Sequence, residues 1–357
     1  MRMTALLLLW AMLLSVPVFA ADEAFGASAL EEALPESARE YMGDATLEEA
    51  TGDTVPARII QHVSQRLNAV LRRSGSTILV MMAVVLICSL SESADSTGKA
   101  ASCVLLAGVA AIGAAALADV DSYMSGALQA METLSDYSRV LLPVLAASAA
   151  ACGAVGKAAA VSAATTVFMD MLLHLSGHLL IPTICGYAAL SIANAAVGGG
   201  ALKTAARLMK SVCTLLLGGL TTVFSLWISV SGVISGSADA AATRLTKSIL
   251  STTLPVVGRI ISDASGALAA AATGLRGLCG SFGLLAVLCI CLTPILELGI
   301  RYLLYKVCAA VCACLAGGRL AELLDNMGSC FGMLLAMTGS GAVFMYVSIF
   351  AFLKTVL

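Results

Sequence analysis

Long apolar stretches recur through most of this 357-residue chain, and they constrain its fold more than any other feature. From Ile78 to Leu357 they follow one another with few charged residues inside them. A helix of about 20 apolar residues spans the hydrocarbon core of a bilayer, so the pattern is typical of a polytopic membrane protein. The chain has 59% hydrophobic and only 12% charged residues, which excludes an ordinary water-soluble domain. We predict an all-α integral membrane bundle with about seven to nine hydrophobic segments, some of them broken or re-entrant.

Nine hydrophobic segments are predicted, over residues 77–90, 100–118, 140–156, 158–175, 179–197, 212–234, 282–300, 303–316 and 330–352. The first and eighth are short for a bilayer, so we expect them to be tilted or re-entrant. Two more polar stretches, near 119–139 and 236–276, are expected to be amphipathic or re-entrant. The first runs into a Leu-Pro-Val triplet at Pro143 and the second contains one at Pro255. Because proline removes a helical hydrogen bond, we expect helix breaks at both prolines.

The N-terminal region divides into three parts before the multispan domain of residues 77–357. Residues 1–20 have the features of a signal peptide, with Arg2 before an apolar run and small residues at a cleavage site. Residues 21–54 form an acidic segment, since ten of the 22 acidic residues precede residue 54. We expect this segment to be extracytoplasmic and either loosely ordered or facing a partner. Residues 55–76 are predicted to form an amphipathic helix at the membrane interface.

The positive-inside rule suggests an orientation for the bundle. If the leader places the mature N-terminus outside, nine crossings bring several basic residues to the cytoplasmic side. These are Lys157, Lys203, Arg207, Lys210, Arg301, Lys306 and Lys354. The same count places four basic residues, Arg244, Lys247, Arg259 and Arg276, on the external side, against the rule. One miscounted hairpin would explain this exception.

Four stretches resemble the stage III sporulation protein AE family of endospore-forming bacteria. They are Thr253–Ala264 (TLPVVGRIISDA), Leu284–Pro294 (LLAVLCICLTP), Tyr302–Ala310 (YLLYKVCAA) and the Gly317-Gly318 pair before Leu323-Leu324-Asp325. The resemblance covers nearly the full chain, including the leader and the order of the segments. It implies a non-enzymatic, permease-like subunit of a secretion-like complex in the mother-cell membrane around the forespore, required for late forespore development. The implied partners are other membrane subunits of that complex, an associated ATPase and a forespore-side protein across the intermembrane space.

Ionisable residues inside the apolar segments are the candidates for a polar path. Asp170, His174 and His178 recur every four residues and share one helix face if the helix continues through Gly177. The alternative, which we favour, is a hairpin at Ser176-Gly177 that leaves both histidines at the wet interface. Glu297 precedes Arg301 by four residues, so an ion pair along one helix is its simplest role and a place in a conduit is the alternative.

Other residues indicate packing rather than chemistry. Gly328 and Gly332 form a GxxxG pattern for close helix packing, within the chain or between copies. The twelve cysteines are interpreted as small apolar packing residues, because their spacing is not that of metal ligands. The chain lacks a phosphate-binding loop, since the lysine of Gly153–Ala158 is not followed by Ser or Thr. We therefore expect a lipid bilayer as environment and no metal, cofactor or nucleic acid.

Two alternatives to the complex subunit remain open from the sequence. The first is a free-standing secondary transporter that would use Asp170, His174 and Glu297 as coupling sites. The second is an intramembrane enzyme, which requires a catalytic constellation deep in the bilayer. The sequence contains no convincing one.

Overall fold

The computed structural model describes residues 27–43, 54–94, 99–253, 257–315 and 318–354, and the side chains of 231–269 and of a few residues elsewhere lie outside that description. Two short helices, α3 (Ala27–Glu32) and α4 (Glu36–Met42), precede the bundle. The bundle consists of α5 (Thr54–Ala94), α6 (Lys99–Ala151), α7 (Val155–Leu175), the π-helical turn η2 (Ser176–Leu180), α8 (Ile181–Val197), α9 (Gly200–Thr253), α10 (Val257–Leu315) and α11 (Gly318–Leu353). The described residues contain no strand, and the predicted all-α membrane fold is confirmed. The predicted signal peptide and Pro255 lie outside the described residues.

Six helical stretches in the described part are long and apolar enough to cross a membrane, where nine segments were predicted. They are Arg58–Ser91, Ser102–Ala151, Val155–Val197, Gly200–Val230, Ala272–Leu315 and Gly318–Leu353. The difference arises because three pairs of predicted segments fuse: 100–118 with 140–156 in α6, 158–175 with 179–197 in α7 to α8, and 282–300 with 303–316 in α10. Likewise, the predicted interfacial helix of 55–76 continues without interruption into the first segment as α5.

The predicted interruption at Pro143 is wrong. Pro143 lies inside α6, which runs continuously for 53 residues and includes the whole polar stretch 119–139. A proline removes one backbone donor, and neighbouring helices can hold the rest of a membrane helix straight enough to continue. At a rise of 1.5 Å per residue α6 is about 80 Å long, so it extends far beyond a ~30 Å hydrocarbon core.

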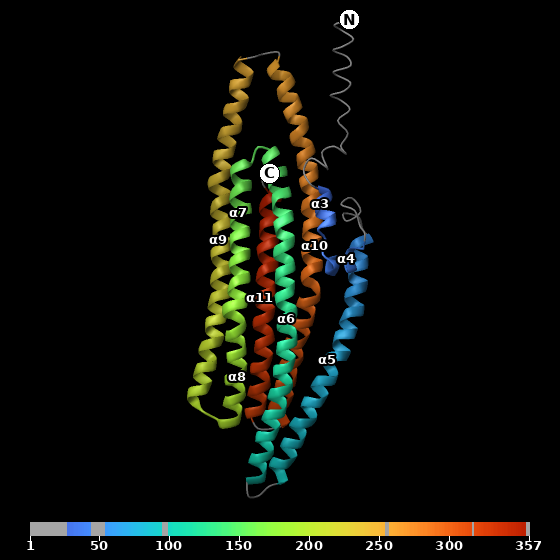
Figure 1. Cartoon of the computed structure of the whole chain (residues 1–357), viewed down its shortest axis with the longest axis vertical. Coiled ribbons are helices and arrows are strands. Elements are labelled where there is room, and N and C mark those ends of the chain that lie inside the picture. Colours follow the sequence, from blue (N-terminus) through green and yellow to red (C-terminus); the bar gives the residue numbers. More distant parts are fainter. Residues whose placement is uncertain (1–26, 44–53, 95–98, 254–256, 316–317, 355–357) are drawn as a thin grey trace.

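With α7, η2 and α8 counted as one helix, the long helices run alternately up and down, with α11 in the middle of the bundle and α5 on its outside (Figure 1). The turn between α6 and α7 lies at the same end of the bundle as the last residue of α11, whereas the turn between α8 and α9 lies at the opposite end. Gly198 ends α8 with φ +73°, a left-handed conformation that favours glycine, and its N–H donates to Asn194 O at 2.9 Å.

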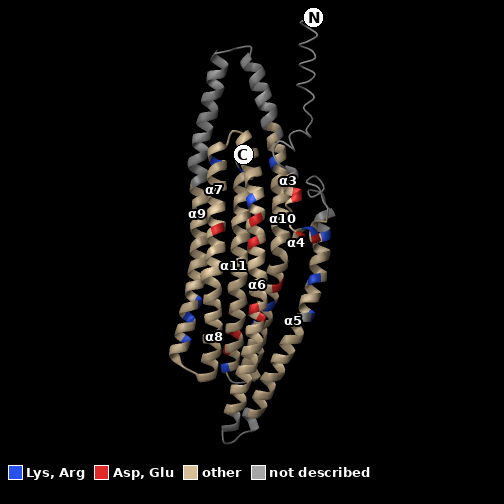
Figure 2. Ribbon diagram, in the orientation of Figure 1, with Lys and Arg blue, Asp and Glu red and all other residues tan. Residues whose placement is uncertain are grey.

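This topology corrects the predicted grouping of basic residues. Lys157 follows the α6–α7 turn and Lys354 follows α11, so both lie at the end opposite to Lys203 near the start of α9. The count of nine crossings had placed all three on one side. Figure 2 shows the basic residues of α9 near the α8–α9 turn, with acidic residues of the neighbouring helices a little further along the bundle.

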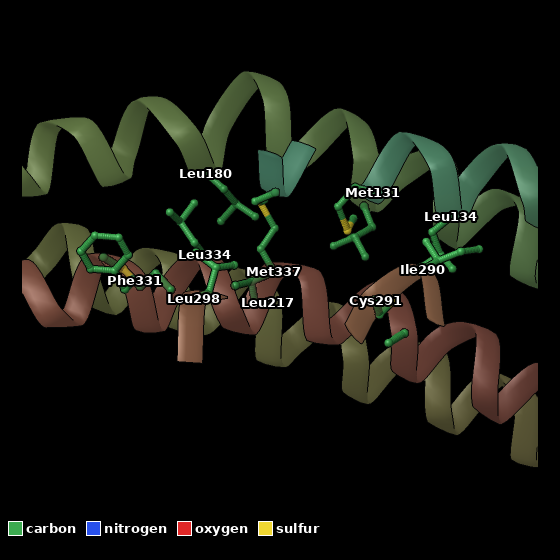
Figure 3. Packing of buried hydrophobic residues seen from close by; sticks show 14 of the residues in the cluster. Met131, Leu134, Leu180, Leu217, Ile290, Cys291, Leu298, Phe331, Leu334 and Met337 are labelled. Atoms are coloured by element: carbon green, nitrogen blue, oxygen red, sulfur yellow. The ribbon is translucent and has the colours of Figure 1, made fainter. Parts of the chain in front are cut away.

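The core is built from side chains that interleave between α11 and the helices around it. Figure 3 shows Phe331, Leu334 and Met337 of α11 among residues of α6, α9 and α10. Near the other end of α11, Phe344 lies 4.3 Å from Phe224 between ring centroids, and the rings join α9 to α11. Eight of the twelve cysteines are buried, where a thiol packs as a small apolar group.

We predict that the α6–α7 turn and the C-terminus lie on one side of the membrane and the α8–α9 turn on the other. Reporter domains inserted after Gly153 and Gly199 and fused after Leu357 test this, with alkaline phosphatase active only outside the cytoplasm and a fluorescent protein as its complement. The insertions at 153 and 357 should give the same result, opposite to that at 199. Three matching results would support the nine-crossing count instead.

Candidate functional site: a polar cavity between α4, α5, α6 and α10

A cavity of about 940 Å³ lies between α4, α5, α6 and α10. We call it the polar cavity because its walls carry six charged side chains and several hydroxyl groups. The charged residues are Glu36 and Glu40 of α4, Arg66 of α5, Asp119 of α6, and Glu297 and Arg301 of α10. Four carboxylates and two guanidinium groups give the lining a formal charge of −2, so the cavity favours cationic or polar occupants.

A buried ion pair lies at one end of the polar cavity. Arg301 donates from Nη1 to Asp119 Oδ2, and only 3% of the Arg301 side chain and 16% of the Asp119 side chain are exposed. Arg301 also donates from Nη2 to the Tyr123 hydroxyl at 3.1 Å, and its guanidinium carbon lies 4.9 Å from the centre of the Tyr123 ring. The Tyr305 hydroxyl donates to Asp119 Oδ2 at 3.2 Å. These contacts give Asp119 both a counter-ion and a hydroxyl donor, as buried charges require.

The ion pair corrects the predicted role of Arg301. We expected Arg301 to pair with Glu297 along one helix, near the cytoplasmic end of the predicted segment of residues 282–300. Instead Arg301 points at α6, and Glu297 lines the cavity without an ion pair among the described residues. Arg301 lies 14 residues before the end of α10 at Leu315, about 20 Å along the helix axis, and so well inside the bundle.

Helix α4 covers one side of the polar cavity. The Tyr41 hydroxyl and Thr293 Oγ1 share a hydrogen bond of 2.6 Å, and Tyr41 is 1% exposed. Arg66 donates to both carboxylate oxygens of Glu40 at 2.7 and 2.9 Å, in an exposed pair. The acidic segment was expected to be loosely ordered or partner-facing, but its residues 29–43 are docked on the bundle, since apolar side chains such as Met42 are buried there.

The predicted group of Asp170, His174 and His178 lies elsewhere. No hairpin forms at Ser176-Gly177, because α7, η2 and α8 are continuous. The two histidine rings stack with centroids 5.7 Å apart on an exposed helix face, and Asp170 pairs with Arg139 of α6 at 3.2 Å. The structure therefore keeps these residues on α7 and η2 apart from Glu297, which lines the polar cavity on the other side of α6 and α11.

Gly328 and Gly332 lie against α10. A Cβ atom at Gly328 would lie 3.2 Å from Tyr305 Cβ, and one at Gly332 would lie 3.2 Å from the Tyr302 ring. The GxxxG pattern thus permits the close approach of α10 and α11, the pair with the most extensive packing in the bundle.

The described residues contain no cluster of three or more His, Cys, Asp or Glu side chains that could hold a metal ion. The polar cavity nevertheless offers carboxylates from separate helices, among them Glu36 of α4 and Glu297 of α10. Such an arrangement can bind or pass polar groups by hydrogen bonding and charge, and this requires no covalent chemistry by the protein.

A sequence model of the stage III sporulation protein AE family matches residues 37–355, which include every long helix and all of α4 but its first residue. The chain belongs to this family. The stage III sporulation protein AE of Bacillus subtilis (strain 168) is 27% identical to it over 199 residues, or 56% of the chain. The matched region spans half the length of that relative. No solved structure matches the chain. The family is named for stage III of sporulation, and the matched residues include all six candidate membrane spans.

The sequence left most lining residues of this sporulation protein's cavity unrecognised. Asp119 was assigned to a polar stretch expected to be amphipathic or re-entrant, and Tyr123 was not singled out. One usable signal was present: Asp119, Ser122, Gly126, Gln129 and Thr133 recur at spacings of three and four, which places them on one face of α6. The partner elements α4 and α10 could not be inferred from that stripe.

Proposed function

We propose that this family member is the permease-like membrane subunit of the sporulation transport complex that joins mother cell and forespore. The family match across residues 37–355 carries the proposal. In this proposal the chain resides in the mother-cell membrane around the forespore, is required for late forespore development and has no enzymatic activity of its own. Its partners are other membrane subunits of the stage III complex, an associated ATPase and a forespore-side protein across the intermembrane space.

The polar cavity supports a transport role within that complex. Ionisable residues among membrane helices are costly and are most often functional, and here Glu297 and Asp119 line one cavity of about 940 Å³. The chain has no phosphate-binding loop, so an ATPase subunit would supply the energy. We propose that the cavity forms part of the polar path and that α4 controls access to it, since α4 is joined to the bundle near Thr293 and Arg66.

The test combines purification and spore formation in sporulating cells of the chain's own host. The full chain, tagged at its C-terminus, should co-purify with the ATPase and the other membrane subunits during sporulation and not during vegetative growth. Gly126→Leu fills the polar cavity without a steric clash at Cβ, because nothing lies within 4 Å of that position. This variant should retain the partners and sharply reduce the number of heat-resistant spores.

Gly277→Leu is the matched control, because Gly277 is exposed on α10, outside the cavity, and also has nothing within 4 Å of its Cβ position. It should sporulate normally. Recovery of the tagged chain without partners would contradict the subunit role, and normal sporulation of Gly126→Leu would contradict the role of the cavity.

The free-standing transporter is the less favoured function. Its three proposed coupling residues do not share a site, since Asp170 and His174 are exposed or paired on α7 while Glu297 faces the polar cavity. Ion or solute flux through liposomes that contain the purified chain alone would favour the transporter over the obligate subunit.

A further inference from the structure

A second cavity, of about 590 Å³, lies between α9, α10 and α11, on a different part of the bundle from the polar cavity. We call it the lateral groove. Its lining includes Lys210, Thr214 and Gly218 of α9, Lys306 of α10, and Ser329 and Ser340 of α11. The proposed transport path does not use this groove.

Two lysines converge at one end of the lateral groove. Lys210 Nζ donates to Ser329 Oγ at 3.0 Å, and Lys306 Nζ donates to the same oxygen at 3.3 Å. The two ammonium nitrogens are therefore no more than 6.3 Å apart, the sum of these distances. Asp325 pairs with Lys306 at 2.7 Å, but no carboxylate in the described part of the chain pairs with Lys210. The Ser329 hydroxyl accepts from both lysines and donates its own proton to the Asp325 backbone oxygen at 3.1 Å. This end of the groove thus carries an uncompensated positive charge.

The rest of the lateral groove is apolar despite its hydroxyl residues. Thr214 and Ser340 donate their hydroxyl protons to the backbone oxygens of Lys210 and Ala336 at 2.9 and 2.8 Å. A hydroxyl that is satisfied by its own helix turns its carbon atoms to the groove. Gly218 adds no side chain, and nothing lies within 4 Å of its Cβ position, so the groove stays open there.

The dimensions and the surroundings of the lateral groove match one leaflet of a bilayer. From Ser329 to Ser340 the groove follows α11 for 11 residues, about 16 Å, close to half of a ~30 Å hydrocarbon core. Apolar side chains border it on both sides, since Leu215 of α9 is 72% exposed and Leu303 of α10 is 60% exposed. Its opening therefore faces lipid, which is the source from which an occupant would enter.

We propose that the lateral groove binds an anionic phospholipid, with the phosphate between Lys210 and Lys306 and an acyl chain along α9 and α11 toward Ser340. The two ammonium groups donate to the phosphate oxygens. The acyl chain takes the apolar part of the groove past Gly218. A bound lipid would fill the gap between α9 and α10, which pack mainly against other helices, and would hold α9 on the bundle.

Native mass spectrometry of the purified full chain in detergent tests this site at fixed ionic strength. The chain is titrated with phosphatidylglycerol and with phosphatidylcholine of identical acyl chains. The wild-type chain should bind phosphatidylglycerol preferentially. Lys210→Gln with Lys306→Gln should bind it about 30-fold more weakly, because each lysine attracts an anionic headgroup roughly fivefold. Arg319→Gln, which removes a charge at the same end of the bundle but outside the groove, should bind as the wild type does.

Gly218→Leu separates a lipid from a free anion. It blocks the apolar part of the groove and leaves both lysines in place, so it should also weaken phosphatidylglycerol binding. A parallel titration with inorganic phosphate should show no competition. Equal binding of the two lipids, unchanged binding in Gly218→Leu, or full competition by inorganic phosphate would each overturn the proposal. If the double lysine variant does not fold, Gly218→Leu alone decides the result.

Discussion

Replacement of Asp119 by alanine should destabilise the bundle by about 3–5 kcal/mol, because it leaves the buried guanidinium of Arg301 without a counter-ion. Arg301 Nε already has no hydrogen-bond partner among the described residues, so the loss of the Asp119 carboxylate would leave mainly the Tyr123 hydroxyl as an acceptor. The effect should appear as a large fall in the thermal unfolding temperature of the purified chain in detergent.

Asp121→Ala is the matched control for this prediction. Asp121 lies two residues further along α6 on an exposed face, so its replacement should change stability by less than about 0.5 kcal/mol. Glu297→Gln should also have a small effect, because Glu297 does not pair with Arg301. Replacing both members of the pair, with Asp119→Leu and Arg301→Met, should recover part of the loss. An Asp119→Ala protein as stable as Asp121→Ala would show that the ion pair is unimportant for the fold.

Valine at Gly328 should destabilise the contact between α10 and α11 by about 1–3 kcal/mol. The new Cβ would meet Tyr305 Cβ at 3.2 Å, and this atom is held close to the backbone and cannot rotate away. The helices must therefore separate, and the Tyr305 hydroxyl would move with respect to Asp119. Thermal unfolding in detergent measures the loss, and the double variant with Gly332→Val should lose more because Tyr302 is displaced as well.

The same substitution at Gly339 provides the control. Gly339 lies on the same helix, and a Cβ there meets nothing within 4 Å. Because valine has a higher helix propensity than glycine, Gly339→Val should be neutral or slightly stabilising. Equal losses at Gly328 and Gly339 would indicate that glycine acts through helix flexibility rather than close packing.

Hydrophobicity alone predicted an all-α membrane bundle correctly, because each apolar stretch reports its own environment. However, it predicted the end of a helix at places where charged or polar residues lie inside a continuous helix. Arg301 was interpreted as the end of a span, yet it is 3% exposed inside α10 because Asp119 neutralises it from a helix 182 residues away in sequence. Lys157 was grouped with Lys203 for the same reason, since each false hairpin reverses the direction of every later segment.

For the candidate site residues too, the sequence predicted local placement but not the contacts between helices. Asp170 and His174 lie four residues apart on α7, and so on one helix face, as their spacing predicts. Spacing cannot predict whether that face packs against other helices, and in the structure His174 is exposed. Glu297 was identified as an unusual intramembrane charge, and it does line the polar cavity, although its predicted partner was wrong.

The fold class, the family and the apolar character of the helices were thus determined by the sequence itself, because they depend on composition and on local order along the chain. The tertiary structure alone decided the number of candidate spans, the docking of α4 through Tyr41, and the two cavities, because each depends on pairs of residues from separate helices. A buried charge is stable only beside its partner, and which residue is the partner is settled when the helices pack. The long apolar stretches therefore specify that this chain folds as membrane helices, and the contacts between α4, α6 and α10 specify where a polar site can exist among them.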